Sequence, residues 1–101
     1  VYAHKIGQAD LELDWSRPAG ELERIVRVGG AWTTFRGRRL KVWAARLADG
    51  VDAVPGSLLG DTVATGRGAL RLLEVQPESR GRQPVEAWLM GAHTEPGESL
   101  G

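Results

Sequence analysis

The sequence predicts a β-rich domain with two short helices, folded as a small OB-like β-barrel. Two observations predict this fold. Short runs of apolar and β-branched residues are separated by glycine and proline turns, which is typical of short strands. Two further segments have their apolar residues at helical spacing. The length of 101 residues fits one domain, residues 1–101, with a single modest core.

The opening segment, residues 1–15, is expected to be extended. Leu11, Leu13 and Trp15 alternate with acidic residues, and a period of two places them on one face of a strand. The acidic residues would then protect an edge of the sheet from pairing with another chain. A catalytic or metal site built from these acids is the less favoured alternative, because no histidine lies within the run.

A first helix is expected to follow this segment and to end at Gly29 and Gly30. Ser16 can accept a backbone N–H as the N-cap, and Pro18 is tolerated in a first turn. Four apolar residues then recur at helical spacing and define the buried face. They are Ala19, Leu22, Ile25 and Val26.

A β-hairpin is predicted over residues 32–47, with Gly37 in its turn. Its second arm alternates an apolar set with a basic set that contains one aromatic residue. The two sets are Leu40, Val42 and Ala44, and Arg39, Lys41 and Trp43. We expect the large ring of Trp43 to lie in the core, and the alternative is an exposed ring that stacks on a base.

The rest of the chain is predicted to contain three strands and a second helix. The strands cover residues 57–59, 62–65 and 69–75, and a tight turn at Gly66-Arg67-Gly68 joins the last two. A polar loop over residues 78–82 is expected to be mobile. The helix should begin at Pro84 and end after Met90, where Gly91 stops it. Its inward-facing residues would be Val85, Trp88 and Leu89.

Composition excludes several classes of site. The chain has no cysteine, so it forms neither disulfides nor thiolate metal sites. His4 and His93 stand alone, and we expect no metal, no cofactor and no catalytic residue in the chain. No membrane span or signal peptide is visible, which favours a cytoplasmic protein. The first residue is valine rather than methionine, so we expect a piece of a longer protein.

Charge is segregated along a chain whose net charge is zero. Residues 17–46 carry eight basic and only two acidic residues. Five of these cations fall within residues 36–46, where no acid occurs, and such a cluster suits the phosphates of a nucleic acid. A solvated hairpin face is the alternative. The candidate RNA-binding residues are Arg36, Arg38, Arg39, Lys41 and Arg46, followed by Arg67 and Arg71.

Several short motifs follow one another along the whole chain. The first are Tyr2-Ala3-His4-Lys5-Ile6, the run ending Leu13-Asp14-Trp15, and the Pro18 helix with Leu22-Glu23-Arg24. The later ones are Ala31-Trp32, Lys41-Val42-Trp43, Pro55-Gly56, Val63-Ala64-Thr65-Gly66-Arg67-Gly68, Leu72, Gln76-Pro77 and Pro96-Gly97-Glu98. In their order and spacing these motifs resemble the C-terminal domain of methionyl-tRNA formyltransferases.

This resemblance implies a role in translation initiation. The parent enzyme would transfer a formyl group from its co-substrate 10-formyltetrahydrofolate to the methionine of initiator methionyl-tRNA. Its chemistry would belong to an N-terminal catalytic domain that uses an Asn, a His and an Asp. The chain contains no asparagine, so that catalytic site cannot lie here. The resemblance implies instead that this domain lays a basic surface along the tRNA.

Two alternatives remain open. One is a structural domain that binds no RNA, in a sugar-nucleotide N-formyltransferase or a formyltetrahydrofolate dehydrogenase. The other is a free-standing barrel for protein interaction, without any link to formyl transfer.

Overall fold

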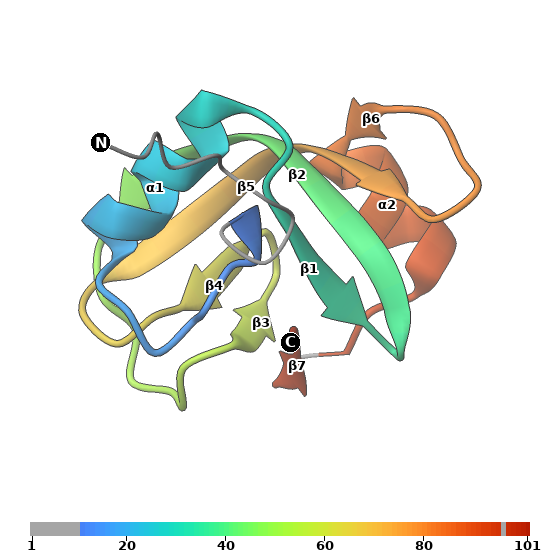
Figure 1. Ribbon diagram of the computed structural model, residues 1–101. Helices are drawn as coiled ribbons and strands as arrows, with labels where there is room; N and C mark the ends of the chain where they lie inside the picture. The colour runs from blue at the N-terminus through green and yellow to red at the C-terminus, as the bar shows by residue number, and fades with distance from the viewer. Residues whose placement is uncertain (1–10, 96) are drawn as a thin grey trace, which may run out of the picture.

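The computed structural model describes residues 11–95 and 97–101 and shows one curved, nearly closed sheet with a helix on each side (Figure 1). The helices are α1 (Ala19–Val28) and α2 (Val85–Ala92). The strands are β1 (Trp32–Phe35), β2 (Arg38–Ala48), β3 (Ser57–Leu59), β4 (Thr62–Ala64), β5 (Ala69–Pro77), β6 (Gln83–Pro84) and β7 (Glu98–Ser99).

The end of the chain nearly closes this sheet into a barrel. The strands lie in the order β1-β2-β5-β4-β3-β7, and β6 pairs separately with β5. An antiparallel bridge between Phe35 and Leu100 then joins β1 to the residues after β7. The backbone N–H of Gly101 also donates to the carbonyl oxygen of Thr34, at 2.8 Å. The predicted small β-barrel with two helices is therefore confirmed.

The interior of the barrel is filled by alternate residues of the strands and by one face of each helix. Residues with an exposed fraction of 0% lie at its centre, and six of the larger ones come from α1, β2, β5 and α2. They are Leu22, Val42, Leu70, Leu72, Val75 and Val85. Leu40 and Val42 face the core, as the alternation in the hairpin predicts, and so do Leu13 and Trp15.

Helix α1 begins without the predicted side-chain cap. The hydroxyl of Ser16 donates to the carboxylate of Asp14 at 2.6 Å, and Pro18 occupies the N-cap position. The first helical N–H, that of Ala19, instead donates to the carbonyl oxygen of Arg67 at 2.9 Å. A neighbouring turn thus satisfies the orphan donor that a capping side chain satisfies in other helices.

Several predicted boundaries are wrong. Helix α2 continues through Gly91 to Ala92 and ends at His93, whose φ of 51° is left-handed. Strand β5 runs on to Pro77, because Gln76 and Pro77 still pair with Lys41 and Leu40 of β2.

Within the opening segment, the described residues 11–15 form a single bridge from Glu12 to Trp32 rather than a strand, and residues 1–10 lie outside the described residues. The 78–82 loop is hydrogen-bonded to β2 and β5. The N–H of Glu78 donates to the carbonyl oxygen of Arg39, and the side-chain amide of Gln76 donates to the carbonyl oxygen of Arg80. The strands β6 and β7 were not predicted.

Candidate nucleic-acid interface

The outer side of the β1–β2 hairpin presents cations next to aromatic rings. In its register Trp32 lies opposite Lys41 and Thr34 lies opposite Arg39. Because opposite residues share a face, these four side chains lie away from the core. The guanidinium carbon of Arg39 lies 4.1 Å from the centroid of the Trp32 ring, within the range of a cation–π interaction.

Trp43 belongs to this outer face, so its predicted place in the core is wrong. The register of β2 against β5 shifts on either side of Ala44, which leaves Trp43 without an opposite residue. Its indole N–H donates to the side-chain oxygen of Gln76 at 2.9 Å. The ring is half-buried between two cations, with Lys41 at 5.7 Å and Arg82 at 5.2 Å from its centroid. Cations and a polar partner take the place of apolar neighbours around this ring.

Arg82 is a residue of this face that sequence reasoning missed. Its guanidinium pairs with the carboxylate of Glu74 at 2.8 Å, and that hydrogen bond lowers the pKa of Glu74. Arg82 lies far from the 36–46 cluster in sequence, and the antiparallel pairing of β2 with β5 brings it close. We call the set Trp32, Arg39, Lys41, Trp43 and Arg82 the basic face.

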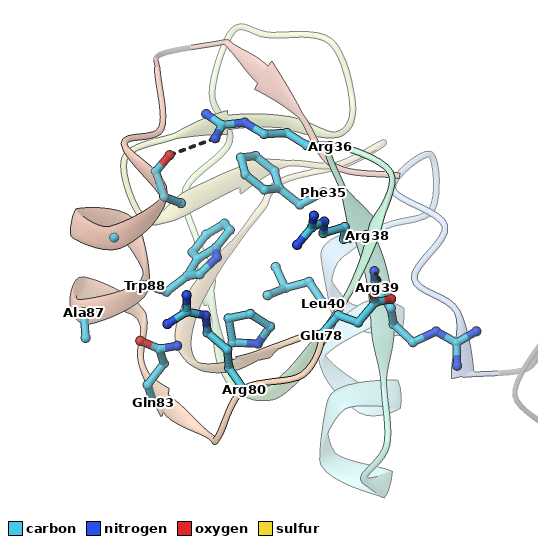
Figure 2. Close-up of a pocket in the computed structure, with 13 residues that line it drawn as sticks. Phe35, Arg36, Arg38, Arg39, Leu40, Glu78, Arg80, Gln83, Ala87 and Trp88 are labelled. Atoms are coloured by element: carbon cyan, nitrogen blue, oxygen red, sulfur yellow. Dashed lines mark hydrogen bonds between the residues drawn. The ribbon is translucent and has the colours of Figure 1, made fainter.

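Arg38 occupies the inner side of the hairpin and points into a groove (Figure 2). The groove has a volume of about 450 Å³ and lies between the hairpin turn, the end of β5 and α2. Arg80 approaches it from the 78–82 loop and is another residue that sequence reasoning missed. The apolar residues that line it are Phe35, Leu40, Pro77, Ala87, Trp88 and Ala92.

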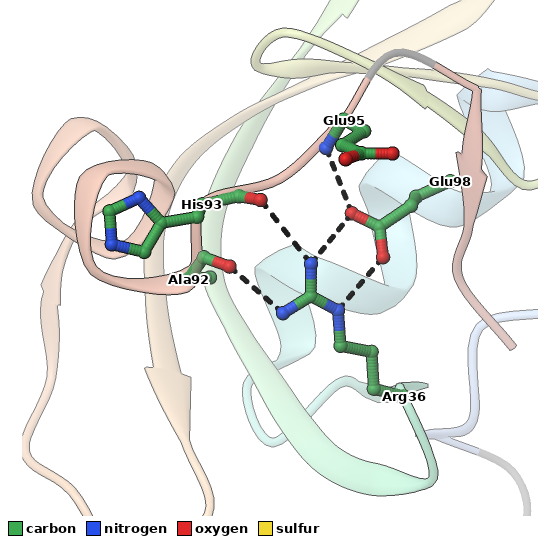
Figure 3. A network of polar contacts seen from close by, with 5 residues as sticks. All are labelled: Arg36, Ala92, His93, Glu95 and Glu98. Carbon is green, nitrogen blue, oxygen red and sulfur yellow. Dashed lines mark hydrogen bonds and ion pairs between the residues drawn. The ribbon is translucent and has the colours of Figure 1, made fainter.

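Arg36 is engaged in a polar network that holds the end of the chain (Figure 3). Its Nε and Nη2 donate to the two carboxylate oxygens of Glu98, at 2.8 Å and 2.9 Å. Its Nη1 donates to the carbonyl oxygen of Ala92 at 2.9 Å, at the end of α2. The guanidinium also lies 4.7 Å from the Phe35 ring centroid. Arg36 thus caps α2 and ties β7 to the hairpin, and we call this network the Arg36 clamp.

The Arg36 clamp predicts a pH-dependent contribution to stability. The hydrogen bond from Arg36 lowers the pKa of Glu98 below the usual carboxyl range. A lowered folded-state pKa stabilises the fold above the ordinary carboxyl titration, and this contribution is lost as pH falls through the lowered value. We expect Glu98→Gln to lower the melting temperature by a few degrees at pH 7 and by a smaller amount at about pH 3.

Thermal unfolding followed by circular dichroism at both pH values checks this prediction. Glu86→Gln, an exposed residue of α2 with no ion pair among the described residues, is the matched control. A loss for Glu98→Gln that stays constant between the two pH values would contradict a charge-dependent clamp.

The remaining predicted cations lie at the other end of β2. Arg46 and Arg71 are opposite each other on β2 and β5, and both are exposed. Arg71 pairs with Asp61 at 2.9 Å, whereas Arg46 has no ion pair among the described residues. Arg67 is exposed in the turn that holds the start of α1. The seven predicted residues therefore do not form one site. They are distributed over the basic face, the groove, the Arg36 clamp and the other end of β2.

A metal centre is not found in the described part of the chain, where His, Asp and Glu side chains nowhere gather in threes. His4 lies outside the described residues, and His93 is exposed at the end of α2. Among the helices of the described residues, none is long and apolar enough to cross a membrane. The chemistry that these residues offer is the binding of anions by arginine and lysine.

Comparison with known proteins identifies similar sequences and folds. The family model described as formyl transferase, C-terminal domain, matches residues 5–93. A methionyl-tRNA formyltransferase of Jannaschia sp. (strain CCS1) is 40% identical over 104 residues, which cover 99% of this chain and 35% of that protein. The corresponding protein of Methylococcus capsulatus is 42% identical over 110 residues, covering 100% of this chain and 35% of its own length.

This chain therefore spans about a third of the length of the curated relatives that it matches, at 35%. Among solved structures, a variant of HypX from Aquifex aeolicus superposes with a TM-score of 0.70. The match covers 94% of this chain and 19% of that one, at 18% sequence identity, and so shows a shared fold alone.

Proposed function

Because the chain belongs to the formyl transferase C-terminal domain family, we propose that it is the tRNA-holding domain of a methionyl-tRNA formyltransferase. The family resemblance predicted from the sequence is thereby confirmed. In the proposed role the parent enzyme takes a formyl group from 10-formyltetrahydrofolate and transfers it to methionine on initiator tRNA, in the cytoplasm. An N-terminal catalytic domain would perform that chemistry, and this chain would contribute no catalytic group.

The basic face is the observation that carries this proposal. It places Arg39, Lys41 and Arg82 on one outer surface, and Arg46 lies farther along the same strand. Seven residues separate Arg39 from Arg46, which corresponds to about 23 Å along a strand at ~3.3 Å per residue. A strip of this length can contact several phosphates of an RNA backbone. Such contacts position an RNA without reading its sequence.

The indole rings of the basic face support backbone binding over base stacking. Arg39 covers the ring of Trp32, and Lys41 and Arg82 lie over the ring of Trp43. Rings that are already in contact with cations hold those cations at fixed positions on the surface. Fixed cations lose less conformational entropy when they bind phosphate than freely rotating ones do.

A second candidate function is a structural domain of a sugar-nucleotide N-formyltransferase or of another formyltetrahydrofolate enzyme. The fold shared with HypX supports this second candidate, because HypX has the same fold under a name other than methionyl-tRNA formyltransferase. The two candidates differ in their ligand, since only the first requires a basic face that binds RNA.

Binding of the chain to initiator tRNA across a salt series tests the proposal. We expect affinity to fall log-linearly with salt, because each phosphate contact releases counterions. The variant Lys41→Gln/Arg46→Gln should bind more weakly and should reduce the salt slope by about 2, since each lost phosphate contact removes about 0.9 from the slope. Fluorescence anisotropy with labelled tRNA measures both quantities.

The control variant removes the same charge from residues that do not belong to the basic face. Arg17→Gln/Arg24→Gln, at and before α1, should leave the slope unchanged. An elongator tRNA and a nucleotide-sugar serve as competing ligands. Binding of the nucleotide-sugar without tRNA binding at low salt would favour the second candidate, and binding of neither would favour a protein-interaction barrel.

A further inference from the structure

The groove beside α2 combines an apolar floor with unpaired cations at its edge. Phe35 and Trp88 meet in its floor as an edge-to-face pair, with ring centroids 5.1 Å apart at 76°. Leu40 of β2 (Figure 2) and Pro77 of β5 also line the groove. A volume of about 450 Å³ falls within the ~300–1,000 Å³ that is typical of sites for small molecules.

Arg38 and Arg80 direct their guanidinium groups over this floor from two sides (Figure 2). Neither side chain has an ion pair or a hydrogen bond among the described residues. The nearby Arg36 differs, because the Arg36 clamp occupies its guanidinium. Two unpaired guanidinium groups at an apolar surface form a site that attracts an anion with an apolar part.

The single acidic residue among those that line the groove does not cancel this charge. Glu78 carries one negative charge against the two positive charges of Arg38 and Arg80, and its carboxylate accepts the backbone N–H of Arg39 at 3.4 Å. Gln83 adds a neutral amide at the opposite edge. The groove therefore has a net positive rim, and it opens beside the basic face, since Arg39 borders both.

We propose that this groove binds one unpaired nucleotide of the RNA. Arg38 and Arg80 hold its phosphate, and its base lies on the apolar floor. This inference rests on the proposed function, because the basic face brings the RNA to the groove. A base within a duplex is excluded by size, since a groove of this volume has no room for the paired strand. A protein partner with acidic and apolar side chains is the other occupant that the test must separate.

The test compares two RNAs with the intact chain. The first is a short single-stranded oligoribonucleotide with a 5′-phosphate, and the second is a blunt hairpin without unpaired ends. Arg38→Gln/Arg80→Gln should weaken binding of the single strand by about tenfold, which corresponds to the loss of charge-assisted hydrogen bonds. It should weaken binding of the blunt hairpin by less than about threefold, because only general phosphate attraction is lost.

Arg17→Gln/Arg24→Gln again removes two cations outside the groove and should leave both affinities unchanged. The indole N–H resonance of Trp88 gives a second readout in nuclear magnetic resonance spectra. It should shift when the oligonucleotide binds and should not shift with inorganic phosphate, because phosphate alone leaves the floor empty.

The outcomes separate the groove from the basic face. Equal weakening of both RNAs by Arg38→Gln/Arg80→Gln, or a Trp88 resonance that does not move, would overturn the groove as a nucleotide site while leaving tRNA binding intact. A peptide of alternating Glu and Leu that displaces the oligonucleotide at lower concentration would assign the groove to a protein partner. Absence of any RNA binding at low salt would overturn the proposed function itself.

Discussion

Replacing Gly66 by alanine should destabilise the domain by about 3 kcal/mol or more, in the range of severe overpacking. A Cβ atom at this position would lie 1.8 Å from the carbonyl oxygen of Ser16 and 2.6 Å from its carbonyl carbon. Both are backbone atoms, so the clash cannot be relieved by rotating a side chain. The two chain segments would have to separate.

That separation would break the contact that starts α1. The N–H of Gly66 donates to the carbonyl oxygen of Arg17 at 3.1 Å, and the carbonyl oxygen of Arg67 accepts the N–H of Ala19 at 2.9 Å. Pro18 and Arg67 also form a parallel bridge. Because these bonds replace the missing side-chain cap, their loss would loosen α1 and with it the fully buried Leu22.

Gly20→Ala is the matched control for Gly66→Ala. Gly20 lies in the first turn of α1 with no neighbouring atom within 4 Å of a built Cβ. Alanine there should stabilise the domain, by up to about 1 kcal/mol, because it restricts the unfolded chain and favours the helix. Urea unfolding followed by circular dichroism measures both variants. A midpoint for Gly66→Ala equal to that of the original chain would show that the two segments can move apart at no cost.

Local patterns predicted most of the fold. The hairpin, the short strands and the two helices follow from alternation, helical spacing and the positions of glycine and proline, all of which act over a few residues. The prediction of Ser16 as the N-cap was wrong, because the first helical N–H donates to the backbone carbonyl of Arg67 instead. A backbone partner from a distant turn leaves no signature in the nearby side chains. The predicted end of α2 at Gly91 was wrong, because a glycine can continue a helix. The left-handed conformation that ends the helix is taken by His93.

The candidate site was predicted in part. The cluster over residues 36–46 was visible as charge, but alternation along β2 divides it between two faces of the hairpin. Arg38 enters the groove, whereas Lys41 joins the basic face. Arg80 and Arg82 were missed because they approach the cluster only through the pairing of β2 with β5. That pairing joins residues between 21 (Ala48 and Ala69) and 37 (Leu40 and Pro77) positions apart, and it cannot be deduced from a local pattern.

Trp88→Ala should lower the free energy of unfolding by about 3–5 kcal/mol, the usual range for removing a buried tryptophan. Trp88 is 5% exposed and packs edge-to-face against Phe35. It belongs to the same core cluster as the fully buried Val85. Helix α2 has eight residues, too few to be stable alone, so it depends on this side chain for its attachment to the barrel. Loss of the helix would also remove one wall of the groove and release the Arg36 clamp from Ala92.

Trp43→Ala is the comparison for Trp88→Ala. It should lower the free energy of unfolding by only about 1–2 kcal/mol, because it removes one hydrogen bond and exposed cation–π contacts. Its half-buried ring leaves no sealed cavity when removed, and water can satisfy Gln76 in place of the indole N–H. The variant should remain folded but bind tRNA more weakly, because Lys41 and Arg82 lose the ring that positions them. Chemical unfolding and tRNA anisotropy on both variants measure these effects. An equal loss of unfolding free energy in the two variants would show that Trp43 contributes to stability as a core residue does. An unchanged tRNA affinity of a folded Trp43→Ala variant would show that this ring has no part in RNA binding.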